Sequence, residues 1–404
     1  MKTPIRGAGV FLVLVLLTVV AVQASASEPC CMVNIKITLE EEVGAIYITG
    51  DHPAMGPWNP SLLLMEGTRT ERHISLPVEQ GTQLNYTFTL GRWERGVLNE
   101  ETQGAKHYAA QIDANQDLVH EELAFKKEPI AYMEDWQSSG VKGTLVYWPD
   151  MESEFVEPTH TVAIWLPPGF DENRRYRVLY MHDGQALFDP RLSNDGEIWH
   201  VDDNVVELIK AGDMEPIIIV SAFNSGVHRM DEYSPWHNAP NYAKFLIREV
   251  MPRVNAEFPT LTGPENTYVM GSSMGGLLSW YLVSQHGEVF GACGCLSTHV
   301  PWSEAWLQQM TGGDTTGLDE TPYIVRDIQN GLELSGAGRF WFDYGTEGLD
   351  ADYEGPHQLI RTWMIEQGYT EGETFVVKKY EGADHDPASW NARLKDPLRF
   401  LYGR

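Results

Sequence analysis

Residues 271–276 read GSSMGG and place one serine, Ser273, midway between Gly271 and Gly275. The apolar run NTYVM precedes this stretch, and the helix-like sequence LLSWYLVSQH follows it. A strand that turns abruptly into a helix through glycines exposes the central serine at the sheet edge, as in a G-x-S-x-G nucleophile elbow. The alternative is an ordinary tight turn, for which glycine and serine are common residues. The flanking patterns favour the elbow and predict that Ser273 is a nucleophile.

A serine nucleophile requires partners elsewhere in the chain, because a base must take its proton and a third group must orient that base. An elbow predicts the chain order serine, acid, histidine. His385 lies in the loop sequence GADHD after the last expected strand, which favours a base over a packed core histidine. The stretch RFWFDYGTEGLDADYEG supplies candidate acids at Asp343, Glu347, Asp350 and Asp352.

The elements that must position these residues begin near Thr161. Short β-rich runs such as TVAIWLPP, RVLYMHDG, IIIVSAF, NTYVMGS, GACGCLS, RFWFDYG and TFVVKKY alternate with helical patterns such as NYAKFLIREVMPRVNAEF. Strands that alternate with helices predict βαβ units and a mostly parallel sheet covered on both faces. We therefore predict an α/β domain over residues 161–404.

The earlier part of the chain has a different pattern of polar and apolar residues. Runs such as VNIKITL, GAIYITG, RHISLPV, QLNYTFTL and VHEELAF alternate polar with apolar residues and are separated by Gly, Pro and Asn. This pattern predicts a small all-β sandwich over residues 27–126. Residues 127–160 show no sustained period and are interpreted as a connecting segment.

The first 26 residues have the three-part plan of a secretory signal peptide. Lys2 and Arg6 precede the apolar run VFLVLVLLTVVAV, and Ala24-Ser25-Ala26 forms an A-x-A cleavage site. An uncleaved membrane anchor is the alternative, but the apolar run is short for a span of about 20 residues. We expect cleavage after Ala26, a secreted or periplasmic protein, and no stable membrane insertion of the mature chain.

Composition excludes some partners. The 404 residues are 43% hydrophobic, enough for a large core, and carry a formal net charge of −28. Signal cleavage would remove two of the 29 basic residues, so that 27 basic against 57 acidic residues give −30. Nucleic acids and anionic membranes are poor partners for such a surface.

Four cysteines are too few for a disulfide scaffold in a chain of this length. Cys30 and Cys31 lie near the expected mature N-terminus, and their disulfide status stays open. Cys293 and Cys295 alternate along FGACGCLS, which predicts that both face the same side of a buried strand. Buried thiols are favoured over a metal site, because no nearby Cys or His completes a zinc spacing.

Four motifs in order resemble the esterase family of α/β-hydrolases that includes enterochelin esterases, feruloyl esterases, S-formylglutathione hydrolases and mycolyltransferases. They are VLYMHDGQALFD at residues 178–189, GSSMGG, FDYGTEGLD and GADHDPASWNARL. The resemblance covers roughly residues 140–404. It implies that Ser273 is the nucleophile, His385 the base and Asp350 the acid, with Glu347 as the alternative acid. Pro387 departs from the family pattern, in which an acidic residue is expected at this position.

The same resemblance implies an oxyanion hole made of backbone N–H groups. One donor is the residue after the nucleophile, Met274, and the other comes from the HDGQ loop, with Gly184 or Gln185 as candidates. His299 follows the next expected strand, where a place on the pocket rim and a structural role are both open.

The N-terminal segment resembles the family 20 starch-binding modules. The sequences IYITGDHPAMGPWNP and LNYTFTLGRWERG carry the matching Gly-x-Trp turn and later Trp-Glu, at Trp58 and Trp93. Indole faces suit the C–H surfaces of sugar rings, so the resemblance implies glucan binding by these two residues. A retained sandwich with core or interface tryptophans is the alternative.

These observations predict an exported serine carboxylic-ester hydrolase with an acyl-serine intermediate, acting on carbohydrate-linked or siderophore esters. No metal or organic cofactor is implied. Acyl transfer to a sugar or polyol on the same scaffold is one alternative, and a carbohydrate-binding protein with an inactive hydrolase domain is another.

Overall fold

The structure of this protein is a computed structural model that describes residues 31–56, 58–301, 303–310, 315–332, 334 and 338–403. The predicted signal peptide and Cys30 lie outside the described residues. Within these ranges, no helix is both long and apolar enough to cross a bilayer.

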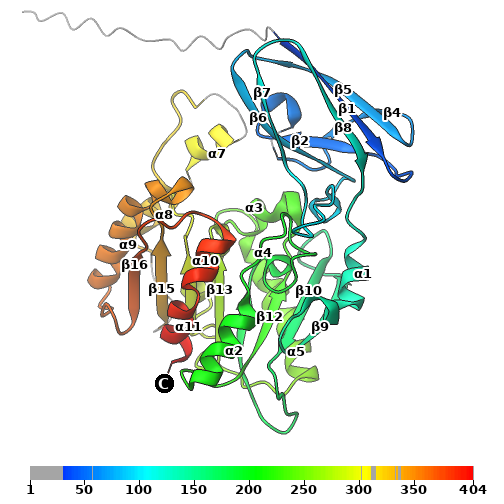
Figure 1. The fold of residues 1–404 in the computed structure, drawn as a ribbon. Coiled ribbons are helices and arrows are strands. Elements are labelled where there is room, and N and C mark those ends of the chain that lie inside the picture. The colour runs from blue at the N-terminus through cyan, green and yellow to red at the C-terminus, as the bar shows by residue number, and fades with distance from the viewer. Residues whose placement is uncertain are drawn as a thin grey trace, which may run out of the picture.

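Two four-stranded sheets form the N-terminal domain (Figure 1). One sheet has the order β4 (Glu66–Gly67), β5 (Glu71–Val78), β1 (Cys31–Leu39) and β8 (Gln116–Leu123). The other has the order β3 (Leu63–Leu64), β2 (Tyr47–Gly50), β6 (Thr82–Thr89) and β7 (Tyr108–Ile112). Strand β1 pairs antiparallel with β5 and parallel with β8.

The polar–apolar alternation of the sequence builds the core of this domain. Along β1, Val33, Ile35 and Ile37 are fully buried, while the residues between them face solvent. Side chains of this kind from both sheets meet in one apolar cluster. The β-sandwich expected from the sequence is therefore present.

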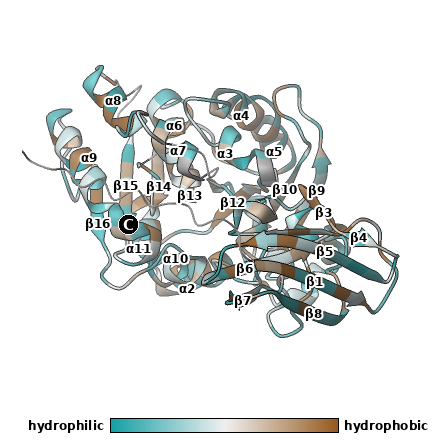
Figure 2. Ribbon diagram, turned by 90° about the horizontal axis from the view of Figure 1, so that it is seen from above, coloured by the Kyte–Doolittle hydropathy of each residue, from teal (hydrophilic) through white to brown (hydrophobic). Residues whose placement is uncertain are grey.

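An eight-stranded sheet forms the centre of the second domain. Its order is β16 (Phe375–Lys379), β15 (Arg339–Tyr344), β14 (Ala292–Leu296), β13 (Thr267–Ser272), β11 (Arg177–Met181), β12 (Ile217–Ala222), β10 (His160–Leu166) and β9 (Thr144–Met151). The strands from β16 to β12 are parallel, and β10 and β9 are antiparallel to their neighbours. All six residues of β12 are buried, and Figure 2 shows this strand and β10 as largely hydrophobic.

Helices cover both faces of this sheet. One face packs against α2 (Val201–Ala211), α10 (Pro387–Arg393) and α11 (Lys395–Tyr402). The other packs against α4 (Ala239–Phe245), α5 (Met251–Glu257), α6 (Met274–Gln285), α8 (Tyr323–Gln329) and α9 (Glu354–Glu366). Helices α3 (Arg229–Glu232) and α7 (Glu304–Met310) lie near the upper edge of the sheet in Figure 1. The layers are those of an α/β-hydrolase.

The segment 127–160 is more regular than its sequence indicated. It contains α1 (Pro129–Glu134) and the edge strand β9, so the eight-stranded sheet begins before residue 161. The pattern of β9 is weak because an edge strand has one partner and leaves several side chains half-buried or exposed.

Cys293 and Cys295 are fully buried on β14, where their sulfur atoms lie 2.7 Å apart in the same core cluster. Their expected common face is therefore observed.

One contact between the two domains involves residues 193–196 of the α/β domain. The buried ammonium of Lys126 donates to the Ser193 carbonyl oxygen at 2.6 Å, and the N–H of Ala105 donates to the Asn194 carbonyl at 2.8 Å. Gly104 must be glycine, because a Cβ atom there would lie 2.0 Å from the backbone of Asp195. Burial lowers the pKa of Lys126 to about 8.

Candidate active site

The predicted elbow is present between β13 and α6. Ser273 has φ 56° and ψ −122°, a conformation that is strained for any residue except glycine. A Cβ atom on Gly271 would lie 2.7 Å from the backbone of Gly275, so the crossing of strand and helix requires glycine at position 271. Ser272 is buried, whereas Ser273 is half-buried. The geometry therefore presents the second serine of the pair and not the first.

Backbone hydrogen bonds hold the strained serine from both sides. Its N–H donates to the Leu296 carbonyl at 2.9 Å, and its own carbonyl accepts from the N–H groups of Leu277 and His299, each at 3.1 Å. Strain of this kind persists only where the surroundings fix it, and such positions gather at functional sites.

Two of the predicted partners meet in an acid–base pair. Nδ1 of His385 lies 2.5 Å from Oδ1 of Asp350. Asp350 is fully buried in the 3-10 turn Gly348–Asp352 after β15, and His385 lies in the loop between β16 and α10. Glu347 is exposed, and its N–H donates to the Ala383 carbonyl at 3.0 Å. The structure thus brings Asp350 to the histidine and leaves Glu347 outside.

Among the hydrogen bonds of the described residues, none joins the Ser273 hydroxyl to His385. The hydrogen bond between Asp350 and His385 is therefore formed, whereas these hydrogen bonds include none between Ser273 and His385. Catalytic hydrogen bonds are often long without substrate and tighten in the Michaelis complex.

Asp350 receives a second set of hydrogen bonds on Oδ2. The Ser297 hydroxyl donates to this oxygen at 2.5 Å, and the N–H of Gly345 donates at 2.6 Å. Although burial opposes ionisation, the hydrogen bonds from His385 and Ser297 hold the pKa of Asp350 below its ordinary value. The acid is therefore ionised when it orients His385.

Ser297 is the centre of a buried network that sequence analysis missed. Its hydroxyl oxygen accepts from Trp390 Nε1 at 3.0 Å and from Arg393 Nη2 at 2.6 Å. Arg393 also lies 3.0 Å from the buried carboxylate of Asp343. Ser297 adopts φ 38° at the end of β14. The sequence features that could have indicated this network are the position of the serine at a strand end and the Trp and Arg that follow the GADH loop.

The two predicted oxyanion donors lie on neighbouring elements. Met274 is the first residue of α6, and the first N–H groups of a helix have no partner within it. Gly184 and Gln185 belong to a short turn after β11, the strand that pairs with β13. The side-chain oxygen of Gln185 accepts from the N–H of Asn224 at 3.2 Å, which fixes this residue in place.

An ion pair beside this turn was also missed. The Asp183 carboxylate accepts from Nε and Nη2 of Arg229 at 2.6 and 2.7 Å and from the Asn224 amide at 2.7 Å. A Cβ atom on Gly275 would lie 3.3 Å from Oδ2 of Asp183, so the pair adjoins the elbow. Burial works against ionisation, but Arg229 keeps the pKa of Asp183 low.

His299 is buried beside the elbow rather than exposed on a rim. Nδ1 lies 2.5 Å from the Tyr353 hydroxyl, and the ring centroid is 4.3 Å from that of Trp306. Burial is the main cause that lowers the pKa of His299 to about 3, with smaller contributions from the neighbouring His385 and Arg229. His299 is therefore neutral, and its backbone N–H supports Ser273.

The two candidate sugar-binding tryptophans lie together. The ring centroids of Trp58 and Trp93 are 6.3 Å apart, and that of His107 is 6.1 Å from Trp58. Trp58 is 41% exposed, whereas Trp93 is half-buried. A Cβ atom on Gly226 would lie 4.0 Å from Cδ1 of Trp93, so this ring faces the α/β domain.

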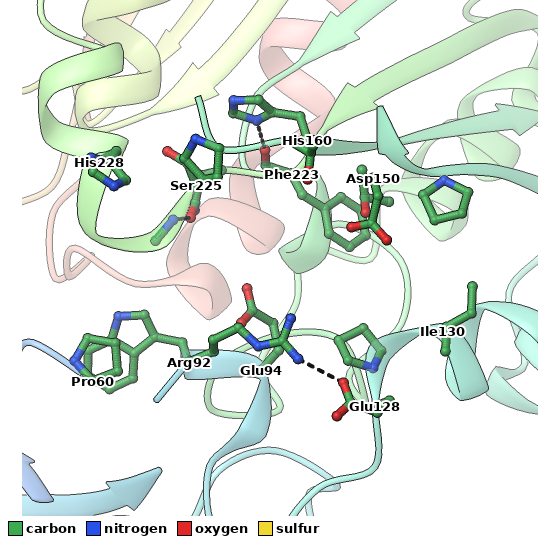
Figure 3. A pocket seen from close by; sticks show the side chains of 18 of the residues that line it. Pro60, Arg92, Glu94, Glu128, Ile130, Asp150, His160, Phe223, Ser225 and His228 are labelled. Carbon is green, nitrogen blue, oxygen red and sulfur yellow. Dashed lines mark hydrogen bonds and ion pairs between the residues drawn. The ribbon is translucent and has the colours of Figure 1, made fainter. Parts of the chain in front are cut away.

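A cleft of about 420 Å³ lies where the two domains meet (Figure 3). Trp93, Arg92 and Glu94 contribute from the N-terminal domain, and the loop 223–228 contributes from the α/β domain. Figure 3 shows Arg92 and Glu128 joined by a hydrogen-bonded ion pair of 2.8 Å across one wall.

Within the described ranges, no group of three or more His, Cys, Asp or Glu side chains is arranged to hold a metal ion.

Comparison with known proteins identifies the class of this fold and site. The model of the family described as "Putative esterase" matches residues 153–401, and the chain belongs to this family. The chain is therefore a carboxylic-ester hydrolase of the serine hydrolase type.

Individual relatives are more distant. The chain is 21% identical over 275 residues to the Bacillus subtilis protein YbbA, covering 62% of this chain and 96% of YbbA. It is 27% identical over 179 residues to an endo-1,4-beta-xylanase/feruloyl esterase of Xylanibacter ruminicola, covering 42% of this chain but only 23% of that enzyme.

Among solved structures, the enterobactin esterase of Shigella flexneri is similar with a TM-score of 0.51 and 13% identity. The similarity covers 91% of this chain and 92% of that one. At this identity the comparison supports the fold alone, and it includes the N-terminal domain.

Proposed function

We propose that this esterase is exported and hydrolyses esters that link an acyl group to carbohydrate, through an acyl-Ser273 intermediate. The observation that carries the mechanism is the 2.5 Å contact between His385 Nδ1 and Asp350, on the same carboxyl edge of the sheet as the Ser273 elbow. Because Nδ1 faces the acid, Nε2 is the ring nitrogen left to accept the Ser273 proton.

In the first half-reaction, Ser273 Oγ attacks the ester carbonyl carbon while Nε2 of His385 takes the hydroxyl proton. The carbonyl electron pair moves to oxygen, and the N–H groups of Met274 and Gln185 donate to the oxyanion. When the tetrahedral intermediate collapses, the bond to the alcohol oxygen breaks and His385 returns the proton to the leaving alcohol.

In the second half-reaction, His385 removes a proton from water, which attacks the acyl-serine carbonyl. Collapse breaks the bond to Oγ, returns the proton to Ser273 and releases the carboxylic acid. Asp350 stays ionised throughout and stabilises the imidazolium form of His385.

Two observations support a carbohydrate-linked substrate. One curated relative is described as a xylanase/feruloyl esterase, and Trp93, whose ring lies beside that of Trp58, faces the α/β domain. We also propose that this domain binds glucan chains through the two tryptophans. Export is supported by the first 26 residues of the sequence.

A panel of p-nitrophenyl esters of increasing acyl length, with acetylated and feruloylated sugars, tests the proposal on the chain that begins after Ala26. Turnover that Ser273→Ala abolishes is expected, with a preference for sugar esters over simple alkyl esters. A wild-type protein that is not labelled by a fluorophosphonate and cleaves none of these esters would refute it. Transfer of the acyl group to added sugar in place of water would instead identify an acyltransferase. Detection of the enzyme in the cytoplasmic fraction alone would refute export.

A further inference from the structure

The interdomain cleft lies close to the predicted nucleophile in the sheet order. Strand β13 ends at the Ser273 elbow, and Asp183 follows the end of its neighbour β11. The next strand, β12, leads into the loop 223–228, which lines the cleft. Adjacent strands are separated by about 4.8 Å, so two strand spacings place this loop about 10 Å from the nucleophile strand. That distance is within reach of a substrate bound at Ser273.

Asn224 connects the cleft to the catalytic edge. It lines the cleft, its side-chain amide donates to Asp183, and its N–H donates to the side-chain oxygen of Gln185. Gln185 is the candidate oxyanion donor, so one residue contacts both the cleft and the loop that would hold the reacting carbonyl.

The cleft lining suits a neutral polyhydroxylated group. Trp93 supplies a flat aromatic face, and polar side chains of both signs surround it: Arg92, Glu94, Glu128, Asp150 and His228. Indole faces pack against the C–H surface of a sugar ring, while charged side chains bond to its hydroxyls. An anionic ligand is disfavoured by the three carboxylates and by the chain's net charge of −28.

We propose that this cleft binds the alcohol part of the substrate, a glycosyl residue of an oligosaccharide ester, and that Trp93 stacks on that sugar. The inference rests on the proposed function and adds the place where the alcohol binds. The N-terminal domain is thereby part of the substrate site, in addition to any binding of distant glucan chains.

The test compares two substrates that share an acyl group and differ in the alcohol, methyl ferulate and a feruloylated arabinoxylo-oligosaccharide. In the full chain, Trp93→Ala and Glu94→Gln should each lower kcat/KM for the oligosaccharide ester relative to methyl ferulate, by at least tenfold for Trp93→Ala. Trp93→Phe, which keeps a flat ring, should recover most of the difference. The matched control is Glu121→Gln, in the same domain on β8 and not part of the cleft lining; it should leave both values unchanged.

A binding measurement separates this inference from the proposed function. Xylohexaose is titrated into the full-length Ser273→Ala protein and into the same protein carrying Trp93→Ala. Binding that depends on Trp93 supports the cleft even if neither ferulate is cleaved, in which case the proposed function fails alone. The inference would be overturned if xylohexaose binding did not depend on Trp93 and if Trp93→Ala changed kcat/KM equally for both ferulates or for neither.

Discussion

The Ser297 hydroxyl donates to Oδ2 of Asp350 at 2.5 Å, on the carboxylate whose other oxygen contacts His385. The same hydroxyl oxygen accepts hydrogen bonds from Arg393 and Trp390, so Asp350 is the partner toward which the hydroxyl proton points. The proposed catalytic acid is therefore oriented by a serine that follows β14 and by a helix, α10, both distant from it in the sequence.

Removing the nucleophile should abolish turnover and leave the fold intact. Ser273→Ala is expected to lower kcat by about a millionfold, because the covalent route is lost. Ser272→Ala is the control, since Ser272 is buried beside it on β13. Steady-state kinetics with a p-nitrophenyl ester measure both variants. If Ser272→Ala were inactive and Ser273→Ala active, the nucleophile would be Ser272 and not Ser273.

The identity of the acid is tested by two amide substitutions. Asp350→Asn should lower kcat far more than Glu347→Gln, by about 10⁴-fold as for the acid of other serine triads, because an amide cannot stabilise the imidazolium of His385. Glu347 is exposed and should be nearly neutral to substitution. The reverse ranking would move the role to Glu347, and two small effects would indicate a serine–histidine dyad.

Ser297→Ala should lower the free energy of unfolding mainly at pH values where Asp350 is ionised. The pKa of Asp350 is lowered in the fold, so its contribution is present above the unfolded pKa of about 3.9 and is lost as the pH falls through the folded pKa. Loss of this hydrogen bond to a charged group should cost about 1.5 to 3 kcal/mol at pH 7. The deficit relative to wild type should shrink below about pH 4.

Urea unfolding at pH 7 and at pH 3.5 measures this difference. Ser279→Ala is the matched control, because Ser279 is also buried but donates to the neutral Gly275 carbonyl at 2.8 Å. Its deficit should be the same at both pH values. A pH-independent deficit for Ser297→Ala would contradict the assigned hydrogen bond.

Arg393→Met should destabilise the protein strongly. The guanidinium lies 3.0 Å from Asp343, and both side chains are almost fully buried. An unpaired buried charge costs about 3–5 kcal/mol. Arg399→Met is the comparison, since its ion pair with Asp213 is exposed and worth about 1 kcal/mol or less. Similar losses for the two variants in denaturant titrations would argue against a buried charge network.

The glucan-binding proposal is tested by retention on insoluble starch and other glucans. The full chain should be retained, and Trp58→Ala combined with Trp93→Ala should release it, because each aromatic contact contributes about 1 kcal/mol beyond burial. Failure of the wild-type protein to bind any glucan would limit the N-terminal domain to a structural role or to the cleft.

Sequence patterns predicted the two domains, the elbow and the candidate residues around it, because glycine spacing and strand alternation are local properties. Local sequence patterns could not decide between Asp350 and Glu347 as the acid, because the answer depends on how the turn after β15 meets the loop after β16. Ser297 and the Asp183–Arg229 pair were missed for the same reason. Their partners lie 53 and 46 residues away in the sequence, and only the sheet order brings them together.

The parallel pairing of β1 with β8 also sets the order in which the N-terminal domain can be completed. β1 lies between β5 and β8, and register partners such as Val33 and Gln116 are far apart in the sequence. Until residues 116–123 have emerged from the ribosome, one edge of β1 has no partner, and unpaired edges promote aggregation. Contacts of such long range form slowly. The sandwich is therefore completed only after β8, the last of its strands, has been synthesised.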